Sequence, residues 1–333
     1  MPASPSLAAA LCVAAFLAAF ALTALARRYA LSRQLVDVPG ERRSHTVATP
    51  RGGGIAIVAV VLPVMVWLGV SGRVAPSISL LGACGLALVA AIGWIDDHRP
   101  LSPWVRLLVH IVAAVLLAGG ASWAGQPFWW TAIVFAFALG LVNVWNFMDG
   151  IDGLASTQLI LVASGFLLLG LGDARALLAC VIAAACLGFL PFNFPRARIF
   201  LGDVGSGALG YLVACLIALA PVHTPGASVV WLLPFSAFLI DAALTLLARI
   251  IRGERWWTPH VQHMYQRCVQ AGHTHAVVTG GYALWTLLSI LAAIWMAGAS
   301  QPVIIGVFAT WYLLGVTIWL IFRIRHTRRT RLS

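Results

Sequence analysis

Residues 77–95 read SISLLGACGLALVAAIGWI and are followed directly by Asp96 and Asp97. The run contains no charged side chain, and it has the length, about 20 residues, that a helix needs to cross the hydrocarbon core of a bilayer. Carboxylates are costly inside a bilayer, so the two aspartates mark the point where the chain leaves the membrane. This stretch therefore predicts a membrane-spanning helix that brings paired acids to a membrane surface.

Apolar runs of similar length recur along the chain, without the period-two alternation that a transmembrane β-barrel requires. Hydrophobic residues make up 61% of the sequence and charged residues 9%, against roughly 25% charged residues in soluble domains. We predict an all-α, polytopic helical membrane protein that forms a single domain over residues 1–333, with about eleven transmembrane helices. The predicted spans lie near residues 7–26, 53–70, 77–95, 104–120, 128–146, 156–171, 174–192, 205–220, 227–248, 276–298 and 303–322.

The basic residues are distributed unevenly between the two sides of these spans. All 21 are arginine, and threading the chain through the spans places all but Arg73 and Arg175 on one side. The positive-inside rule makes that side cytoplasmic. We therefore predict a multi-pass protein of the bacterial inner membrane, with its N-terminus outside and its C-terminus inside. The net charge of +11 then reflects topology and contact with anionic membrane lipid, and it argues against a nucleic-acid partner.

Half of the 10 acidic residues lie in three short loops on the arginine-rich side. Adjacent carboxylates repel one another, so holding them ionised favours a nearby cation. Mg²⁺ is usually held by one or two carboxylates together with substrate phosphates. The loops therefore predict a cation site at the cytoplasmic surface. Their acids are Asp96 and Asp97, Asp149 and Asp152, and Asp203.

The middle loop has the clearest pattern of the three. Asn146, Asp149 and Asp152 recur at every third residue, which would place them on one face of a helical turn. Gly150 and Gly153 instead suggest a broken helix. Either conformation gathers oxygen ligands in one place.

Other polar residues on the same side are candidates for phosphate or metal binding. Arg51 precedes three glycines that open a predicted span, and glycine N–H groups at a helix start can approach a phosphate. His260 and His263 could bind phosphate or ligate a metal. Asp241 lies inside a predicted span, where a carboxylate is either a functional group or half of an ion pair, for example with Arg249.

The sequence resembles the polyprenyl-phosphate N-acetylhexosamine-1-phosphate transferases, glycosyltransferase family 4, from about residue 37 to residue 275. The matching elements are Ser44-His45 with Thr49-Pro50-Arg51-x-Gly53-Gly54, Asp96-Asp97, Asn146-x-x-Asp149-Gly150-x-Asp152-Gly153-Leu154 and Phe200-Leu201-Gly202-Asp203-x-Gly205-Ser206. Many relatives carry His-x-His-His where this chain has His260-Val261-Gln262-His263. This loop does not match the phospho-N-acetylmuramoyl-pentapeptide transferase closely, and eleven spans fit the initiators of O-antigen and enterobacterial common antigen synthesis better.

The resemblance implies a fold with cytoplasmic catalytic loops and a Mg²⁺-dependent reaction, with Mn²⁺ as an alternative. A UDP-sugar and polyprenyl phosphate would give a polyprenyl-diphosphate-sugar and UMP, with an N-acetylhexosamine as the expected sugar. It implies catalytic roles for Asp96, Asp97, Asp149 and Asp152, and metal ligation by Asp152 and Asp203. We expect substrate contacts from Ser44, His45, Arg51, Asn143, Asn146, Arg196, His260 and His263.

Two other classes of protein could use acidic loops at a membrane. A transporter would place ionisable residues near the midplane of discontinuous helices, whereas only Asp241 lies within a span here. A lipid-phosphate hydrolase would use the same acids and metal but release phosphate. The sequence leaves open whether the protein forms a homodimer.

Overall fold

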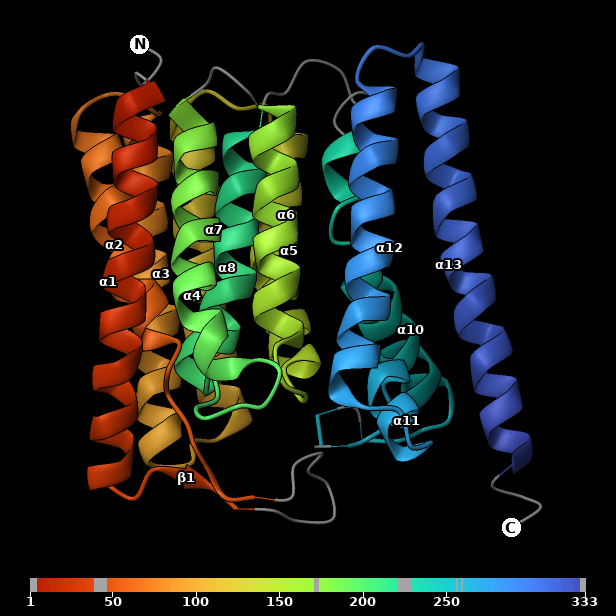
Figure 1. Ribbon diagram of the computed structural model, residues 1–333. Helices are drawn as coiled ribbons and strands as arrows, with labels where there is room; N and C mark the ends of the chain where they lie inside the picture. The colour runs from red at the N-terminus through yellow and green to blue at the C-terminus, as the bar shows by residue number, and fades with distance from the viewer. Residues whose placement is uncertain are drawn as a thin grey trace.

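The computed structural model describes residues 5–38, 47–170, 174–220, 229–255, 257–258 and 260–329, which form a set of roughly parallel helices (Figure 1). A two-residue antiparallel pair, β1 and β2, lies at one end of the bundle. The elements are α1 (Pro5–Ser32), β1 (Val36–Asp37), β2 (Thr49–Pro50), α2 (Ile55–Val70), α3 (Pro76–His98), α4 (Pro103–Trp123), α5 (Phe128–Met148), α6 (Leu154–Leu169), α7 (Ala174–Asn193), α8 (Asp203–Leu219), the 3₁₀-helix η1 (Val229–Leu232), α10 (Ser236–Ile251), α11 (Met264–Gln270), α12 (His275–Met296) and α13 (Gln301–Arg329).

The prediction of a helical, polytopic membrane protein is confirmed. Among the described residues, 7 helices are long and apolar enough to cross a membrane, namely α1, α3, α4, α5, α7, α12 and α13. Three shorter apolar helices, α2, α6 and α8, match further predicted spans. The predicted span near residues 227–248 is divided instead into η1 and α10, so the number of crossings stays a prediction.

The helix α8 forms the centre of the bundle. Its residues from Val204 to Leu219 are all buried, as expected for a helix that is apolar on every side. It contacts α2, α3, α4, α5, α6 and α7. A second group, α10, α12, α13 and η1, packs together beside this bundle and joins it through α5 and α6.

Glycines allow the helices to approach α8 closely at its start. A Cβ atom on Gly54 would collide with the backbone of Gly205, and one on Gly93 would collide with the backbone of Asp203. Backbone contact at these points fixes the start of α2 and the last part of α3 against the beginning of α8. The N-terminus of α8 is therefore held in place by packing before any polar contact is considered.

We expect Gly54→Ala to destabilise the protein by about 1–3 kcal/mol or more, because an added methyl group in a packed core forces the backbone to shift. Thermal unfolding in one detergent would measure the effect. Gly119→Ala, near the C-terminal end of α4, is the matched control, since nothing lies within 4 Å of the added Cβ. Equal melting temperatures for the two variants would contradict the close packing of α2 on α8.

Candidate active site

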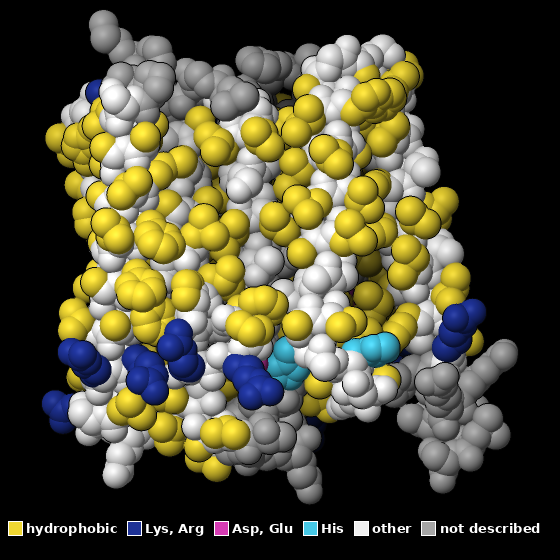
Figure 2. Space-filling model, in the orientation of Figure 1, with side chains coloured by type: hydrophobic (Ala, Val, Ile, Leu, Met, Phe, Trp, Pro, Cys, Tyr) yellow, Lys and Arg dark blue, Asp and Glu magenta, His cyan; other side chains and the backbone are white. Residues whose placement is uncertain are grey.

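The acidic loops meet at one end of the bundle, where α3 and α5 end and α8 begins. The space-filling view shows arginine side chains in a band near the same end (Figure 2). This agrees with the one-sided distribution expected from the sequence. Which side of the membrane this end faces stays a prediction.

Asp97 caps the N-terminus of α8. Its Oδ1 accepts a hydrogen bond from the backbone N–H of Asp203 (3.1 Å), and its Oδ2 accepts one from Val204 (3.1 Å). The first N–H groups of a helix have no partner within the helix, and a carboxylate is the most favourable acceptor for them. The side chain of Asp97 is only 2% exposed. Asp97 therefore holds Asp203 at a fixed position.

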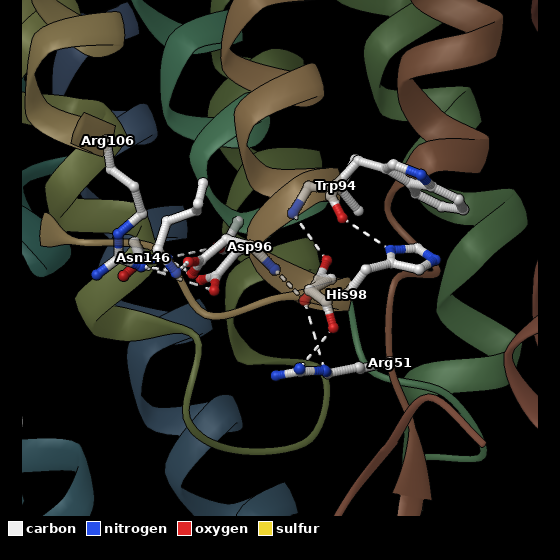
Figure 3. A network of polar contacts seen from close by, with 11 residues as sticks. Arg51, Trp94, Asp96, His98, Arg106 and Asn146 are labelled. Atoms are coloured by element: carbon white, nitrogen blue, oxygen red, sulfur yellow. Dashed lines mark hydrogen bonds and ion pairs between the residues drawn. The ribbon is translucent and has the colours of Figure 1, made fainter. Parts of the chain in front are cut away.

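Asp96 and Arg106, both labelled in Figure 3, form a chain of charged contacts that continues to Asp203. Oδ2 of Asp96 accepts a hydrogen bond from Nη1 of Arg106 at 2.9 Å, and the same nitrogen lies 3.7 Å from Oδ2 of Asp203. Nδ2 of Asn146 donates to Oδ1 of Asp203 (2.7 Å) and to Oγ of Ser206 (2.9 Å). The structure thus brings together two of the predicted acids and the predicted Asn146 from three different helices.

Asp149 lies in the turn between α5 and α6, which confirms that the helix breaks in this loop. Within the described part of the chain, its carboxylate accepts no hydrogen bond. Burial, together with the charges of Asp203, Asp97 and Asp152, raises the pKa of Asp149 to about 8. A carboxyl group surrounded by other carboxylates is ready to receive a cation or to remain protonated.

Asp152 faces a different group of residues from Asp203. Its Oδ2 accepts a hydrogen bond from the backbone N–H of Ala197 (3.2 Å) and lies 3.2 Å from Nδ1 of His275. Thr279 donates its hydroxyl to the backbone carbonyl of Asp152 (3.1 Å). Asp152 and His275 line a surface pocket together with the predicted substrate-binding residue Arg196.

The glycine-rich loop before α2 does not form the predicted phosphate cradle at Gly53 and Gly54. Their N–H groups donate to the carbonyls of Phe200 and Leu201, each at 2.9 Å. Arg51 donates from Nη2 to the backbone carbonyl of Asp97 (2.5 Å), and its Nε lies 3.7 Å from Oδ1 of Asp97.

Of the other predicted substrate contacts, Ser44 and His45 lie outside the described residues. Asn143 donates to the carbonyl of Leu139 on its own helix (2.8 Å).

His260 and His263 lie together, with ring centroids 4.8 Å apart. Burial, with the nearby His263 and Arg249, lowers the pKa of His260 to about 4, so its ring is neutral at pH 7. Nδ1 of His260 accepts the backbone N–H of Gln262 (3.3 Å). A neutral ring that accepts at Nδ1 carries its proton on Nε2, so His260 is set to donate a hydrogen bond.

Gln262, at the position of the family's middle histidine, joins a charged network instead. Its Oε1 accepts from Arg252 (2.6 Å), and its Nε2 donates to Glu254 (2.9 Å). Arg249 also pairs with Glu254, at 2.9 Å. Arg249, the ion-pair partner suggested for Asp241, is thus bound to Glu254 at the end of α10. Asp241 instead accepts hydrogen bonds from α11 and α12.

The described residues contain no group of three or more His, Cys, Asp or Glu side chains placed to hold a metal ion. A site of one or two carboxylates completed by substrate phosphates remains compatible with the geometry, because Mg²⁺ is commonly bound in that way. Besides burial, the charges of Asp203, Asp97 and Asp152 raise the pKa of Asp149, so these four carboxylates form one cluster that such a site could use.

Sequence reasoning missed three residues that shape the site. Arg106 was counted only as a topology arginine, although it contacts Asp96 and Asp203. His275 and Tyr265 were not singled out for a contact with the acidic loops. The position of Arg106 could have indicated its contact with Asp96. It lies at the start of the next predicted span, and only a short loop separates that span from Asp96.

Comparisons of the sequence with known proteins point to one family. Residues 79–220 match the family described as Glycosyl transferase family 4. The decaprenyl-phosphate N-acetylglucosaminephosphotransferase of Mycobacterium tuberculosis is 32% identical, over 75% of this chain and 72% of its own length. A probable undecaprenyl-phosphate N-acetylglucosaminyl 1-phosphate transferase of Bacillus subtilis is 26% identical, over 85% and 83%. The phospho-N-acetylmuramoyl-pentapeptide-transferase of Heliobacterium modesticaldum is 29% identical, over 58% and 67%.

We expect Asp97→Asn to lower both the stability and the activity of the protein, because an amide can accept only through its single oxygen. Hydrogen bonds to charged groups contribute about 1.5–3 kcal/mol each, so a loss of that order should appear in thermal unfolding. Asp203→Asn is the matched comparison, since it leaves the cap of α8 in place. A melting temperature unchanged in Asp97→Asn would show that the cap is dispensable.

Proposed function

Because the chain belongs to glycosyl transferase family 4, we propose that it transfers N-acetylglucosamine 1-phosphate from UDP-N-acetylglucosamine to a polyprenyl phosphate and releases UMP. The family resemblance expected from the motifs is confirmed. The choice of sugar follows the names of the mycobacterial and Bacillus relatives. The product would be the first lipid-linked intermediate of a surface glycan such as O-antigen.

The observation that supports this proposal most is the convergence of three acidic loops at one end of a membrane bundle. Arg106 lies between Asp96 and Asp203, and Asp97 accepts the backbone N–H of Asp203. The charges of Asp97 and Asp203 act on Asp149. A lipid phosphate and a water-soluble nucleotide sugar can meet only at a membrane surface. A site in the plane of that surface therefore fits the two substrates.

The reaction exchanges one phosphoanhydride for another. An oxygen of the lipid phosphate forms a bond to the sugar-bearing phosphorus, while the bond from that phosphorus to the bridging oxygen of UMP breaks. UMP leaves with the electron pair. Little net bond energy is required, so catalysis consists mainly of positioning and charge stabilisation.

The residues present fit a divalent cation. The cluster of Asp96, Asp97, Asp149 and Asp203 contains more carboxylates than the two arginines beside it, Arg51 and Arg106, can neutralise. Burial, together with the charges of Asp203, Asp97 and Asp152, raises the pKa of Asp149. We propose that Asp152 and Asp203 hold Mg²⁺, with Mn²⁺ as an alternative. When bound, the ion would draw charge from the diphosphate.

The protein side chains prepare this site for the substrates. Asn146 donates a hydrogen bond to one oxygen of Asp203, and Arg106 lies near the other. Arg196, beside Asp152 in the pocket, offers positive charge to a phosphate, and the neutral His260 offers a hydrogen-bond donor.

We also propose the topology that the arginines favour. The end that carries the site and the arginine band would be cytoplasmic, with the N-terminus outside and about eleven crossings. This places the site where UDP-sugars are made. Family membership argues against the transporter alternative, and a hydrolase would differ in its products.

One assay separates these activities. Purified protein is incubated with radiolabelled UDP-N-acetylglucosamine, polyprenyl phosphate and Mg²⁺. Lipid-linked label with an equal amount of UMP supports the transferase. Free phosphate without lipid-linked label would replace the proposal with a hydrolase, and a panel of other UDP-sugars would correct the donor if N-acetylglucosamine is not transferred.

We expect Asp203→Asn and Asp152→Asn each to lower turnover by at least about 100-fold, the size typical of losing one charge-stabilising group. Melting temperatures should stay close to that of the wild type. The control is Asp173→Asn, at a position that the sequence places in a loop on the opposite side and that lies outside the described residues. Wild-type turnover in Asp203→Asn or Asp152→Asn would exclude that side chain as essential.

A further inference from the structure

The turn that carries Asp149 is contacted by the side chain of Tyr265, whose backbone N–H is bound by a second buried carboxylate, Asp241. We propose that Asp241 and Tyr265 are positioning residues that act in series, Asp241 fixing the start of α11 and Tyr265 fixing the Asp149 turn. This inference rests on the proposed function for its kinetic effect. Its structural part can be tested without any substrate.

Asp241 is a buried anchor point for four helices. Its side chain is 1% exposed, and a carboxylate so deeply buried is stable only when its oxygens are hydrogen-bonded. Donors from several elements meet it. They are the backbone N–H of Met264 (2.8 Å) and of Tyr265 (3.4 Å) on α11, the hydroxyl of Tyr282 on α12 (2.7 Å), Nε1 of Trp319 on α13 (3.4 Å) and Oγ1 of Thr245 on α10 itself (3.2 Å).

The contact with α11 fixes the first residues of a very short helix. A helix of seven residues is marginal on its own, because nucleation costs more than so few hydrogen bonds return. Two of its first N–H groups are satisfied by Asp241 rather than by water. The backbone of Tyr265 is thereby tied to α10.

Tyr265 carries this restraint across to the acidic loop. Its side chain is 1% exposed, and its hydroxyl donates to the carbonyl of Phe147 at 2.9 Å. Phe147 belongs to the last turn of α5, whose carbonyls have no partner within the helix. The tyrosine therefore caps α5 two residues before Asp149.

Gly150 shows how tightly the turn lies against this tyrosine. A Cβ atom on Gly150 would collide with the hydroxyl oxygen of Tyr265. The backbone on both sides of Asp149 thus touches one side chain, through a hydrogen bond at Phe147 and through direct contact at Gly150. Displacement of a catalytic group by about 1 Å can cost roughly 100-fold in rate, so this restraint matters for the reaction.

The experiment compares Asp241→Asn, Tyr265→Phe and the double variant with Thr245→Val. Thr245→Val removes another hydrogen bond to the same carboxylate but lies outside the path to the turn. We expect each of the first two variants to lower kcat by about 10-fold or more with little change in KM for the UDP-sugar. Because the residues act in series, the double variant should be no slower than the slower single variant.

Hydrogen exchange of the backbone amides of residues 147–153, measured without substrate, gives a readout independent of activity. We expect faster exchange in Asp241→Asn and in Tyr265→Phe and unchanged exchange in Thr245→Val. Unchanged exchange in Tyr265→Phe, or kinetic effects that add in the double variant, would overturn the inference. If the wild type itself lacks transferase activity, the proposed function fails while the exchange result still decides the restraint.

A rescue experiment tests the contact without relying on a buried charge. Gly150→Ala should lose most activity because its methyl group collides with the tyrosine hydroxyl. Adding Tyr265→Phe removes that oxygen and should recover part of the loss, so that the double variant is faster than Gly150→Ala alone. A double variant that is slower than both single variants would show that Tyr265 does not act on this turn.

Discussion

The carboxylate of Asp97 bound to the first two N–H groups of α8 is the interaction on which both the bundle and the site depend. The helix α8 begins among α2, α3 and α5, in close backbone contact with Gly54 and Gly93, and Val204 in its first turn is fully buried. An unpaired buried N–H group costs free energy comparable to a lost hydrogen bond. The central helix can therefore start here only because α3 ends in an acceptor. The same contact places the side chain of Asp203 at the mouth of the site.

The sequence predicted the helices well because their cause is local. A run of about 20 apolar residues has one stable conformation in a bilayer, and ten of the predicted segments each correspond to one helix. The exception near residues 227–248 could not be found by hydropathy. The break coincides with Pro234, which lies between η1 and α10. Its fixed φ and missing N–H interrupt a helix, a signal of backbone geometry rather than of polarity.

The sequence predicted which residues form the polar site, but not what each of them does there. Residue type and spacing indicated that the loop aspartates would converge, and the structure brings four of them within electrostatic reach. The role of Gly53 and Gly54 was misread, because a glycine before a helix serves equally for phosphate binding and for close approach of two backbones. Only the position of residues 200–205, far away in sequence, separates these two uses. Likewise, Tyr265 carries no motif, since its importance comes from lying against Gly150.

Burial and hydrogen bonding give the five loop aspartates different chemical capacities. Asp97 has both oxygens on backbone N–H groups, and Asp96 has them on Leu101 and Arg106. Their charge is compensated by donors that cannot move away without disturbing a helix. Asp149 has no such donor in the described structure, and burial together with the charges of Asp203, Asp97 and Asp152 raises its pKa to about 8. Asp149 therefore lacks the compensation that Asp96 and Asp97 have, and together with the proposed metal ligands Asp152 and Asp203 it forms the part of the cluster whose charge a cation would neutralise.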